Sequence, residues 1–334
     1  MADYITIKGD NIPSVSSDPA NPVEGQVWYN TTSTVLKGYK AVIGTGTWSS
    51  GGNINTARYG PGGTGTQTAA ICAFGEPPLT TAAETYDGSS WTNITSANTA
   101  RYIVASIGQT QSDFAGVGGY GDPTNSTKTE IWNGSSWTES GQLGTARFGW
   151  SGGAGTTTAG LVTGGGGGSP STAPTLTDIF NGSTWSEGGA LNTGRQYSAT
   201  GGLTSTAALT MGGYGVPPSN PTRRAYVEEY DGSSWAVQTE INTARIESGA
   251  GGTTSDMVLS GGNIPGPTGI TETWNGTAWT EVADMSGAKA AMGRTAGPSS
   301  SMALYGGHQP GTNNATEEWT VPATTYAIKT FTAS

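Results

Sequence analysis

Hydrophobic and polar residues alternate over short stretches of this chain, and glycine-rich turns interrupt the alternation again and again. The clearest unit reads aromatic, Asn or Asp, Gly, two further residues and Trp. Asn-Gly and Asp-Gly dipeptides signal a tight turn, because both residues tolerate positive φ. Each unit therefore predicts a short β-hairpin with a large aromatic residue on each arm. These hairpins span residues 86–91, 132–137, 180–185, 230–235 and 274–279.

Two further kinds of position keep a fixed distance from these hairpins. Ten residues after each hairpin Trp, and after Trp48, stands a basic residue: Arg58, Arg101, Arg147, Arg195, Arg245 and Lys289. Two residues before an aromatic stands an acid: Glu84, Glu130, Asp178, Glu228, Glu272 and Glu317. Between base and acid lies a glycine pair or its remnant, and only the stretch from this pair to the acid varies in length. Fixed spacing indicates packed strands, and the variable stretch indicates a surface loop.

Each repeat therefore predicts four strands, here called a to d. Strand a starts at the base, strand b ends at the glycine pair, strand c carries the acid and strand d carries the Trp. Four-stranded repeats of this length indicate the blades of a β-propeller. Strands a, b and c occur six times, but only five d strands follow their c strands. The strand around Trp48 is therefore expected to complete the blade of Trp319, while the alternating run 326–331 either competes for that edge or begins a seventh blade.

The order Arg, Gly-Gly, Glu-x-Tyr, Trp resembles the kelch repeat, and the resemblance covers residues 48–319. It implies an all-β fold, a six-bladed β-propeller of four-stranded kelch-like blades. The chain departs from kelch proteins in its b strands, which are rich in Ala, Gly, Ser and Thr. Small residues suit the crowded centre of a propeller, so the Trp and Tyr side chains are expected between blades at larger radius.

Residues 1–40 lie outside the repeats and predict an extended arm and a hairpin for anchoring or assembly. The propeller is then expected over residues 41–325 and a terminal strand or tail over 326–334. The hairpin within residues 25–39 is similar to those of bacteriophage tail fibres. Together with the Gly/Ser/Thr-rich repeats, it makes the chain resemble structural virion proteins of marine bacteriophages. That resemblance implies a non-enzymatic tail, fibre or capsid-associated protein, which is assembled in the host cytoplasm. Its partners would be other virion proteins, with copies of itself and a host-surface glycan as further options.

The composition argues against nucleic-acid binding, a membrane span and a disulfide framework. The 334 residues carry a net charge of −10 with only 14 Lys and Arg, so no basic patch for nucleic acid is expected. No apolar stretch approaches the roughly 18 residues that indicate a membrane span, and no usual signal peptide is expected. The single cysteine, Cys72, excludes an intramolecular disulfide and is expected to be a small buried hydrophobic residue.

The same residues argue against catalysis. With one histidine, His308, and one cysteine, the chain cannot assemble a copper-oxidase site or a Ser-His-Asp triad. We therefore expect no catalytic residues, no bound metal and no cofactor, and a glycan-acting enzyme is the weaker alternative. The six bases either form a ring that binds a central anion or pair with the six acids. One acid per base favours pairing, and buried pairs set register more clearly than they add stability.

The loops between strands b and c are the best binding candidates. Their prolines lower the ordering cost of binding, and their tyrosines can stack on sugars. His308 is expected to be a loop residue rather than a metal ligand. The candidates are Tyr120, Asp122, Tyr214, Pro217, Ile264 and His308. Solvent-facing loops without a ligand fit as well, and a secreted or surface-bound carbohydrate-binding propeller of a bacterium is the alternative to a virion protein.

Overall fold

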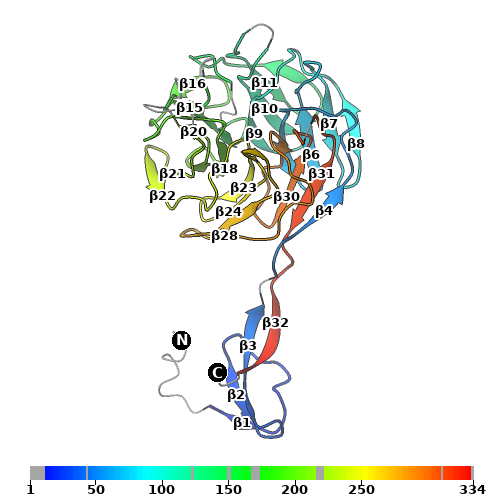
Figure 1. Ribbon diagram of the computed structural model, residues 1–334, viewed down its shortest axis with the longest axis vertical. Helices are drawn as coiled ribbons and strands as arrows, with labels where there is room; N and C mark the ends of the chain where they lie inside the picture. Colours follow the sequence, from blue (N-terminus) through cyan, green and yellow to red (C-terminus); the bar gives the residue numbers. More distant parts are fainter. Residues whose placement is uncertain are drawn as a thin grey trace. The chain divides into compact units, whose positions relative to one another are not determined.

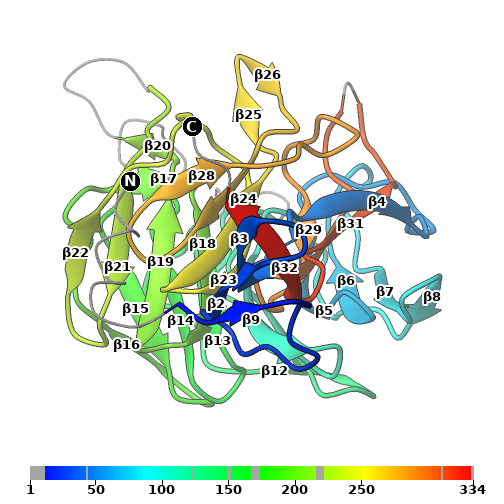
Figure 2. The same ribbon diagram turned by 90° about the horizontal axis from the view of Figure 1, so that it is seen from below.

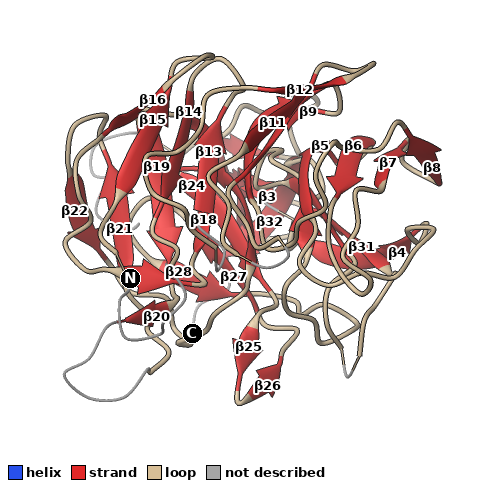
Figure 3. Ribbon diagram, turned by 90° about the horizontal axis from the view of Figure 1, so that it is seen from above, coloured by secondary structure: helices blue, strands red, loops and turns tan. Residues whose placement is uncertain are grey.

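The structure is a computed structural model that describes residues 12–42, 44–121, 124–148, 152–166, 174–215, 222–309 and 311–331. Every regular element in these ranges is a β-strand, and no helix occurs in them (Figure 3). The chain divides into two compact units. Unit 1 comprises residues 1–45 and 321–334, and unit 2 comprises residues 46–320.

The described part of unit 2 contains six four-stranded antiparallel sheets, numbered here in chain order. Sheet 1 consists of β5 (Gly62–Thr66), β6 (Ala69–Ala73), β7 (Ala83–Tyr86) and β8 (Trp91–Ile94). Sheet 2 consists of β9 (Ala105–Thr110), β10 (Asp113–Val117), β11 (Thr129–Trp132) and β12 (Trp137–Glu139). Sheet 3 consists of β13 (Gly152–Gly155), β14 (Gly160–Thr163), β15 (Thr177–Phe180) and β16 (Trp185–Glu187). Sheet 4 consists of β18 (Ala199–Thr204), β19 (Ala207–Met211), β21 (Val227–Tyr230) and β22 (Trp235–Gln238). Sheet 5 consists of β23 (Gly249–Thr253), β24 (Asp256–Ser260), β27 (Thr271–Trp274) and β28 (Trp279–Glu281). Sheet 6 consists of β29 (Gly293–Arg294), β30 (Ser301–Tyr305), β31 (Thr316–Thr320) and β4 (Thr47–Gly51).

Two short antiparallel pairs accompany these sheets. They are β17 (Arg195–Gln196) with β20 (Tyr214–Gly215), and β25 (Asn263–Ile264) with β26 (Gly266–Pro267). The β25–β26 hairpin projects from the sheets (Figures 2 and 3).

Sheet 6 joins the two ends of unit 2. Its fourth strand is β4, which pairs antiparallel with β31 and places Trp48 opposite Trp319. The two indole rings lie 5.4 Å apart. This is the pairing that the complementary missing strands predict, and Figure 1 shows β4 beside β31.

The first strands of the sheets lie innermost and contact one another in a cyclic order. β5 contacts β9, β9 contacts β13, and the series continues through β18, β23 and β29 back to β5. Figure 1 shows β9, β18 and β23 near the centre of unit 2 and β8, β22 and β28 near its rim. The inner strands leave no room for side chains at some positions: a Cβ atom on Gly153 would lie 2.2 Å from the carbonyl oxygen of Ser106 in the neighbouring sheet.

The hydrophobic core consists of separate clusters between neighbouring sheets. One cluster joins Phe74 of the first repeat to Phe114 and Trp137 of sheet 2. Another joins Trp91 of sheet 1 to Tyr305 of sheet 6, with ring centroids 4.7 Å apart. Aromatic residues therefore supply much of the inter-sheet packing, as the composition of the hairpins predicts.

Strand a starts later than the sequence analysis predicts. In sheets 1, 2, 4, 5 and 6 the first strand begins four residues after the base, for example at Ala105 after Arg101. The reason is the residue two positions after the base, which has positive φ, as in Ile103 (φ 54°) and Ala291 (φ 61°). A residue in the left-handed region interrupts a strand, so the base itself precedes the sheet.

The aromatic hairpins are present, but their turns differ from the predicted type. Only the glycine has positive φ, for example 91° at Gly88. The Asp87 carboxylate accepts hydrogen bonds from the backbone N–H groups of Ser89 and Ser90, both at 2.8 Å. Tyr86 pairs with Trp91 across a four-residue loop. The Asn or Asp therefore acts through its side chain as an Asx turn rather than through positive φ.

Unit 1 is a four-stranded sheet in the order β1 (Ser14–Val15), β2 (Val27–Asn30), β3 (Val35–Val42) and β32 (Thr325–Phe331). β32 pairs antiparallel with β3, so the run 326–331 neither joins the last sheet of unit 2 nor begins a seventh. The physical reason is that β4 already occupies the edge of β31, whereas β3 offers a free edge to an alternating strand.

The Asp18 carboxylate connects several residues of unit 1 through hydrogen bonds. Its carboxylate accepts hydrogen bonds from Lys37 Nζ at 2.8 Å, Trp28 Nε1 at 3.0 Å and Asn30 Nδ2 at 2.7 Å. These donors, Lys37 first, lower the pKa of Asp18 to about 2.

Candidate functional site

Each of the six bases forms an ion pair with the acid predicted as its partner. The distances are 3.0 Å for Arg101–Glu130, 2.8 Å for Arg245–Glu272 and 3.1 Å for Lys289–Glu317. The other pairs are Arg58–Glu84, Arg147–Asp178 and Arg195–Glu228. All six bases are buried, and Asp178, at 15% exposure, is the most exposed of the acids. The bases are therefore neutralised within their own sheets and do not offer a free cationic ring to a central anion.

Each ion pair also connects several segments of its repeat through hydrogen bonds to the backbone. The Arg101 guanidinium also donates to the carbonyl oxygens of Gly118 at 2.6 Å and Lys128 at 3.0 Å. Glu130 accepts a hydrogen bond from the backbone N–H of Asn98 at 2.7 Å. Burial lowers the pKa of Arg101, and Glu130 opposes that shift. One buried pair thus joins the end of strand b, the start of strand c and the turn before the base.

The residue after each base pairs with the residue after the glycine pair. These bridges place six pairs of residues at equivalent positions of the six sheets, and many of these residues are aromatic. The pairs are Tyr59–Glu76, Tyr102–Tyr120, Phe148–Gly166, Gln196–Tyr214, Ile246–Asn263 and Ala290–His308.

Several of these aromatic rings form a continuous edge. The ring centroids are 6.2 Å apart for His308–Tyr59 and 6.2 Å for Tyr59–Tyr102. The series continues from Tyr102 to Tyr120 at 5.6 Å and from Tyr120 to Phe148 at 5.8 Å. Contacts of this length are typical of edge-to-face aromatic packing, which fixes the orientation of each ring.

Four of these five rings, all except Tyr120, line an open cavity of about 470 Å³, which we call the aromatic bowl. Its volume lies in the range of small-molecule sites, roughly 300–1,000 Å³. The bowl is lined by Tyr59, Glu76, Pro77, Tyr102, Ile103, Phe148, Tyr197, His308, Gly311 and Thr312.

Backbone hydrogen bonds between repeats hold the residues with positive φ next to the bowl. The N–H of Ile103 donates to the carbonyl of Gly60 at 2.8 Å, and the N–H of Gly60 donates to Ala291 at 3.1 Å. The N–H of Ala291 donates to Glu247 at 3.0 Å, and that of Glu247 donates to Tyr197 at 2.9 Å. Because each of these bonds joins one repeat to the next, the bowl residues are fixed relative to one another.

The bowl combines protonated phenols with carboxylates. Burial raises the pKa of Tyr59 and Tyr102, and burial together with Glu247 raises the pKa of Tyr197 to about 12. Burial also raises the pKa of Glu247 to about 7, against the opposing charge of Arg223. At neutral pH the phenol groups remain protonated, so they donate and accept hydrogen bonds while their ring faces offer apolar surface.

The comparisons with known proteins bear on the fold. A solved structure described as "Structure of YjhT" matches this chain with a TM-score of 0.68 at 14% sequence identity. The match covers 83% of this chain and 99% of that chain. At this identity the likeness shows the fold alone. No family model matches the sequence, and no curated protein matches it.

Some of the binding candidates expected from the sequence lie in or beside the bowl. His308 lines it, Tyr120 contacts Tyr102 and Phe148 in its edge, and Tyr214 contacts Tyr197 with ring centroids 5.8 Å apart. Ile264 lies instead in the projecting β25–β26 hairpin. Asp122 and Pro217 lie outside the described residues.

The position after the base was not among the predicted binding residues. That position holds Tyr59, Tyr102 and Phe148 in the first three repeats, so an aromatic signal at fixed register was present in the sequence. Tyr197 and Glu247 stand one residue further along and carry no comparable signal.

A free cysteine and clusters of metal-binding side chains are two further kinds of reactive group. Cys72 is buried and unpaired with any other cysteine, and burial raises the pKa of its thiol to about 12. In the part of the chain that the structure describes, no three His, Cys, Asp or Glu side chains gather as metal ligands do. Within the same part, no helix is long and apolar enough to cross a membrane.

Proposed function

We propose that sheets 1 to 6 are the blades of a closed, kelch-like six-bladed β-propeller. The cyclic contacts of the inner strands support closure. So do two hydrogen bonds between the first and last repeats: Gly60 N–H to the Ala291 carbonyl, and Trp91 Nε1 to Thr316 Oγ1 at 3.0 Å. Ring closure leaves every sheet flanked by two others and protects the inner edges.

We propose that this propeller is a non-enzymatic structural protein of a bacteriophage virion that recognises a host-surface glycan through the aromatic bowl. The bowl is the observation that carries the recognition role. Saccharides present apolar ring faces and many hydroxyl groups, and the tyrosines of the bowl match both with flat faces and hydrogen-bonding phenols. The virion setting rests on the resemblance of the repeats and the N-terminal hairpin to phage structural proteins.

Unit 1 supports the role of an assembly segment. Seven large hydrophobic residues are exposed in the described chain, and all except Val237 belong to unit 1: Ile12, Val23, Tyr29, Tyr326, Ile328 and Phe331. Exposed apolar residues that gather in one small unit are typical of protein–protein contact surfaces. We therefore assign contacts with other virion proteins to unit 1 and glycan recognition to unit 2.

Glycan binding can be tested on the purified protein with an array of bacterial surface glycans. Tyr102→Ala removes one wall of the bowl and is expected to weaken binding of any recognised glycan about fivefold, since a good aromatic contact contributes on the order of 1 kcal/mol. Tyr29→Ala, which removes an exposed tyrosine of unit 1, is the matched control and should leave binding unchanged. Equal loss in both variants, or no glycan bound by the wild type, contradicts the recognition role.

The bowl serves equally in a secreted or surface-bound carbohydrate-binding propeller of a bacterium. Mass spectrometry of purified phage particles separates the two settings. A stoichiometric presence in particles supports the virion protein. Absence from particles together with presence in a bacterial culture supernatant supports the alternative.

A further inference from the structure

The aromatic bowl combines its ring faces with negative charge. Glu76 is one of its lining residues, and the lining residues that the structure describes include no Lys or Arg. Lys and Arg are also missing from the sequence of the stretches of unit 2 outside the described ranges, which are residues 122–123, 149–151, 167–173, 216–221 and 310. Those stretches therefore add no positive side chain to the bowl.

A second carboxylate, that of Glu247, acts on the same site. The equivalent residues of two other repeats, Ile103 and Tyr197, share its positive φ, and both line the bowl. Burial and then the charge of Glu247 raise the pKa of Tyr59 and of Tyr197. The Glu247 carboxylate therefore lies close enough to act electrostatically on two walls of the bowl.

These two carboxylates are not held in ion pairs. None of the ion pairs in the described chain includes Glu76 or Glu247. Arg223 opposes the charge of Glu247, but its guanidinium donates its hydrogen bonds to Asn263, at 3.0 Å and 2.8 Å. Burial raises the pKa of Glu76, and it raises that of Glu247 to about 7. A bound cation offsets the cost of burying such carboxylates, so the site favours positive ligands.

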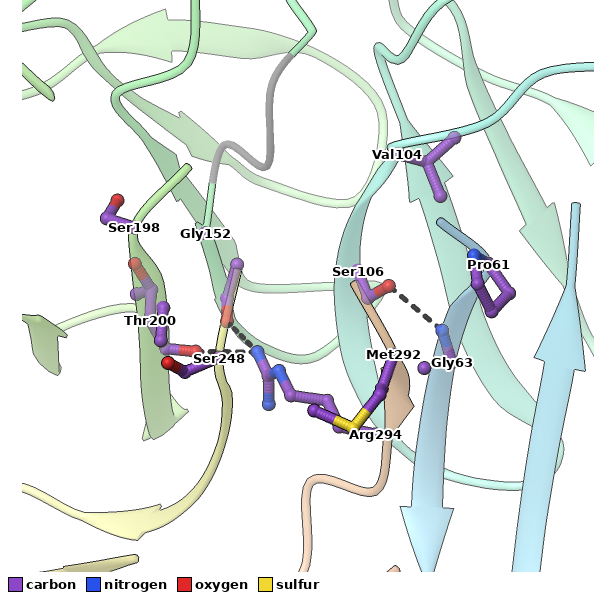
Figure 4. Close-up of a pocket in the computed structure, with 13 residues that line it drawn as sticks. Pro61, Gly63, Val104, Ser106, Gly152, Ser198, Thr200, Ser248, Met292 and Arg294 are labelled. Carbon is purple, nitrogen blue, oxygen red and sulfur yellow. Dashed lines mark hydrogen bonds between the residues drawn. The ribbon is translucent and has the colours of Figure 1, made fainter. Parts of the chain in front are cut away.

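The other cationic side chains of unit 2 have partners elsewhere. The six bases of the repeats pair with their acids, and Lys128 pairs with an acid at the surface. Arg294 lies among the first strands of the sheets, where it donates to three backbone carbonyls (Figure 4). Arg224 lies over the ring of Tyr226, 5.5 Å from its centroid. None of these cations is among the charges that shift the pKa of Glu247.

The aromatic walls suit a cation as well as the face of a sugar ring. A cation is attracted to the face of a Tyr or Phe ring when it lies within about 6 Å of the ring centroid. Such a contact is present beside the bowl, because the Arg223 guanidinium lies 5.7 Å from the ring centroid of Tyr214, which packs on Tyr197. Proteins commonly recognise quaternary ammonium groups with aromatic sites of this kind.

We propose that the aromatic bowl selects ligands that carry a positively charged ammonium group, so that the glycan recognised there bears such a substituent. The rings of Tyr59, Tyr102 and Phe148 contact the ammonium group. Glu76 and Glu247 supply the compensating negative charge, which also disfavours anionic glycans. This inference rests on the proposed recognition role of the bowl and adds a charge preference to it.

Choline and its uncharged analogue dimethylbutanol, in which a carbon atom replaces the nitrogen, test this preference. Binding of each probe to the full chain is measured by NMR titration at about pH 8, where the Glu247 carboxylate is ionised. Choline is expected to bind the wild type about tenfold more tightly than dimethylbutanol. Glu76→Gln should weaken choline binding about fivefold and leave dimethylbutanol binding unchanged. Glu187→Gln, which removes an exposed acid of β16, is the matched control and should change neither.

The comparison of the two probes on the wild type does not require a variant to fold. Equal binding of choline and dimethylbutanol, or binding of neither, overturns the charge preference, and so does a Glu76→Gln variant that keeps the full preference. The glycan array separates this result from the recognition role. Neutral glycans bound without a preference for choline overturn this inference alone. Choline bound without any glycan supports the charge preference and contradicts glycan recognition.

Discussion

At the scale of single residues, the buried ion pairs define each repeat more sharply than any other feature. The base precedes the first strand of its sheet and the acid lies in the third, and a loop of variable length separates them, yet they meet in every repeat. Their fixed distances from the neighbouring aromatic residues made the pairing predictable, because residues held at fixed, packed positions keep such a register. A pair of this kind is a weak source of net stability, but losing one partner leaves a buried charge alone.

Glu130 and Glu139 allow this to be tested within one hairpin. They lie opposite each other on β11 and β12. Glu130 pairs with buried Arg101, whereas Glu139 pairs with Lys128 at the surface at 3.3 Å. Glu130→Gln is expected to lower the free energy of unfolding by about 3–5 kcal/mol. Glu139→Gln should change it by less than about 1 kcal/mol. Denaturant unfolding measures both, and similar losses in the two variants contradict the structural role of the buried pair.

Glu247 makes stability depend on pH in a defined direction. Burial raises its pKa from 4.5 to about 7 in the folded protein. Between these two values the folded state retains a proton that the unfolded state releases, so stability falls as pH rises through this window. Glu247→Gln removes this contribution while keeping the size of the side chain. The Tm of the wild type relative to Glu247→Gln should therefore decline from pH 4.5 to 7 and then level off, and a constant difference over this range contradicts the assignment.

At the scale of elements, the sequence predicted which strands form but not where all of them begin. The aromatic hairpins and the glycine pairs located strands b, c and d, because turn chemistry and register are local. The start of strand a depends on a residue with positive φ that is Gly60 in one repeat and Ile103, Tyr197 or Glu247 in others. Only Gly60 signals such a conformation from its residue type. Hydrogen bonds between repeats impose it elsewhere, and these bonds exist only once the sheets are assembled.

The bowl was predictable in part for the same reason. The loops after strand b were recognisable from their prolines and tyrosines, so Tyr120, Tyr214 and His308 were found. The side chains after the bases line the bowl because the strand is interrupted just beyond them. This interruption was not visible in the sequence, and Tyr59, Tyr102 and Phe148 were therefore missed. The terminal strand β32 was misplaced because an alternating run pairs with any free edge, and sequence pattern does not say which edge is free.

At the scale of the whole of unit 2, the central question is whether the first and last sheets act as one body. The aromatic cluster of Trp91 and Tyr305 lies between them, and β4 carries the chain from the start of unit 2 into its last sheet. In an open array of repeats each unit contacts only its neighbours, so a weakened terminal unit can unfold separately. In a closed ring the last sheet has a neighbour on each side, so its loss would expose the packing surfaces of both.

Trp48→Ala distinguishes these two cases. The substitution removes the ring that packs on Trp319 and the indole N–H that donates to Thr271 of sheet 5 at 3.0 Å. Since Trp48 is half-buried, the expected cost is roughly 2 kcal/mol, or about 5 °C in Tm. Val237→Ala, which trims an exposed residue of β22, is the control and should leave the Tm unchanged. In a closed propeller, hydrogen exchange should show β5, β18 and β29 losing protection together, in one cooperative step at the lower temperature. Early loss of protection in β29 to β31 alone, while β5 and β18 keep theirs, would show that sheet 6 unfolds independently and that the ring is not closed.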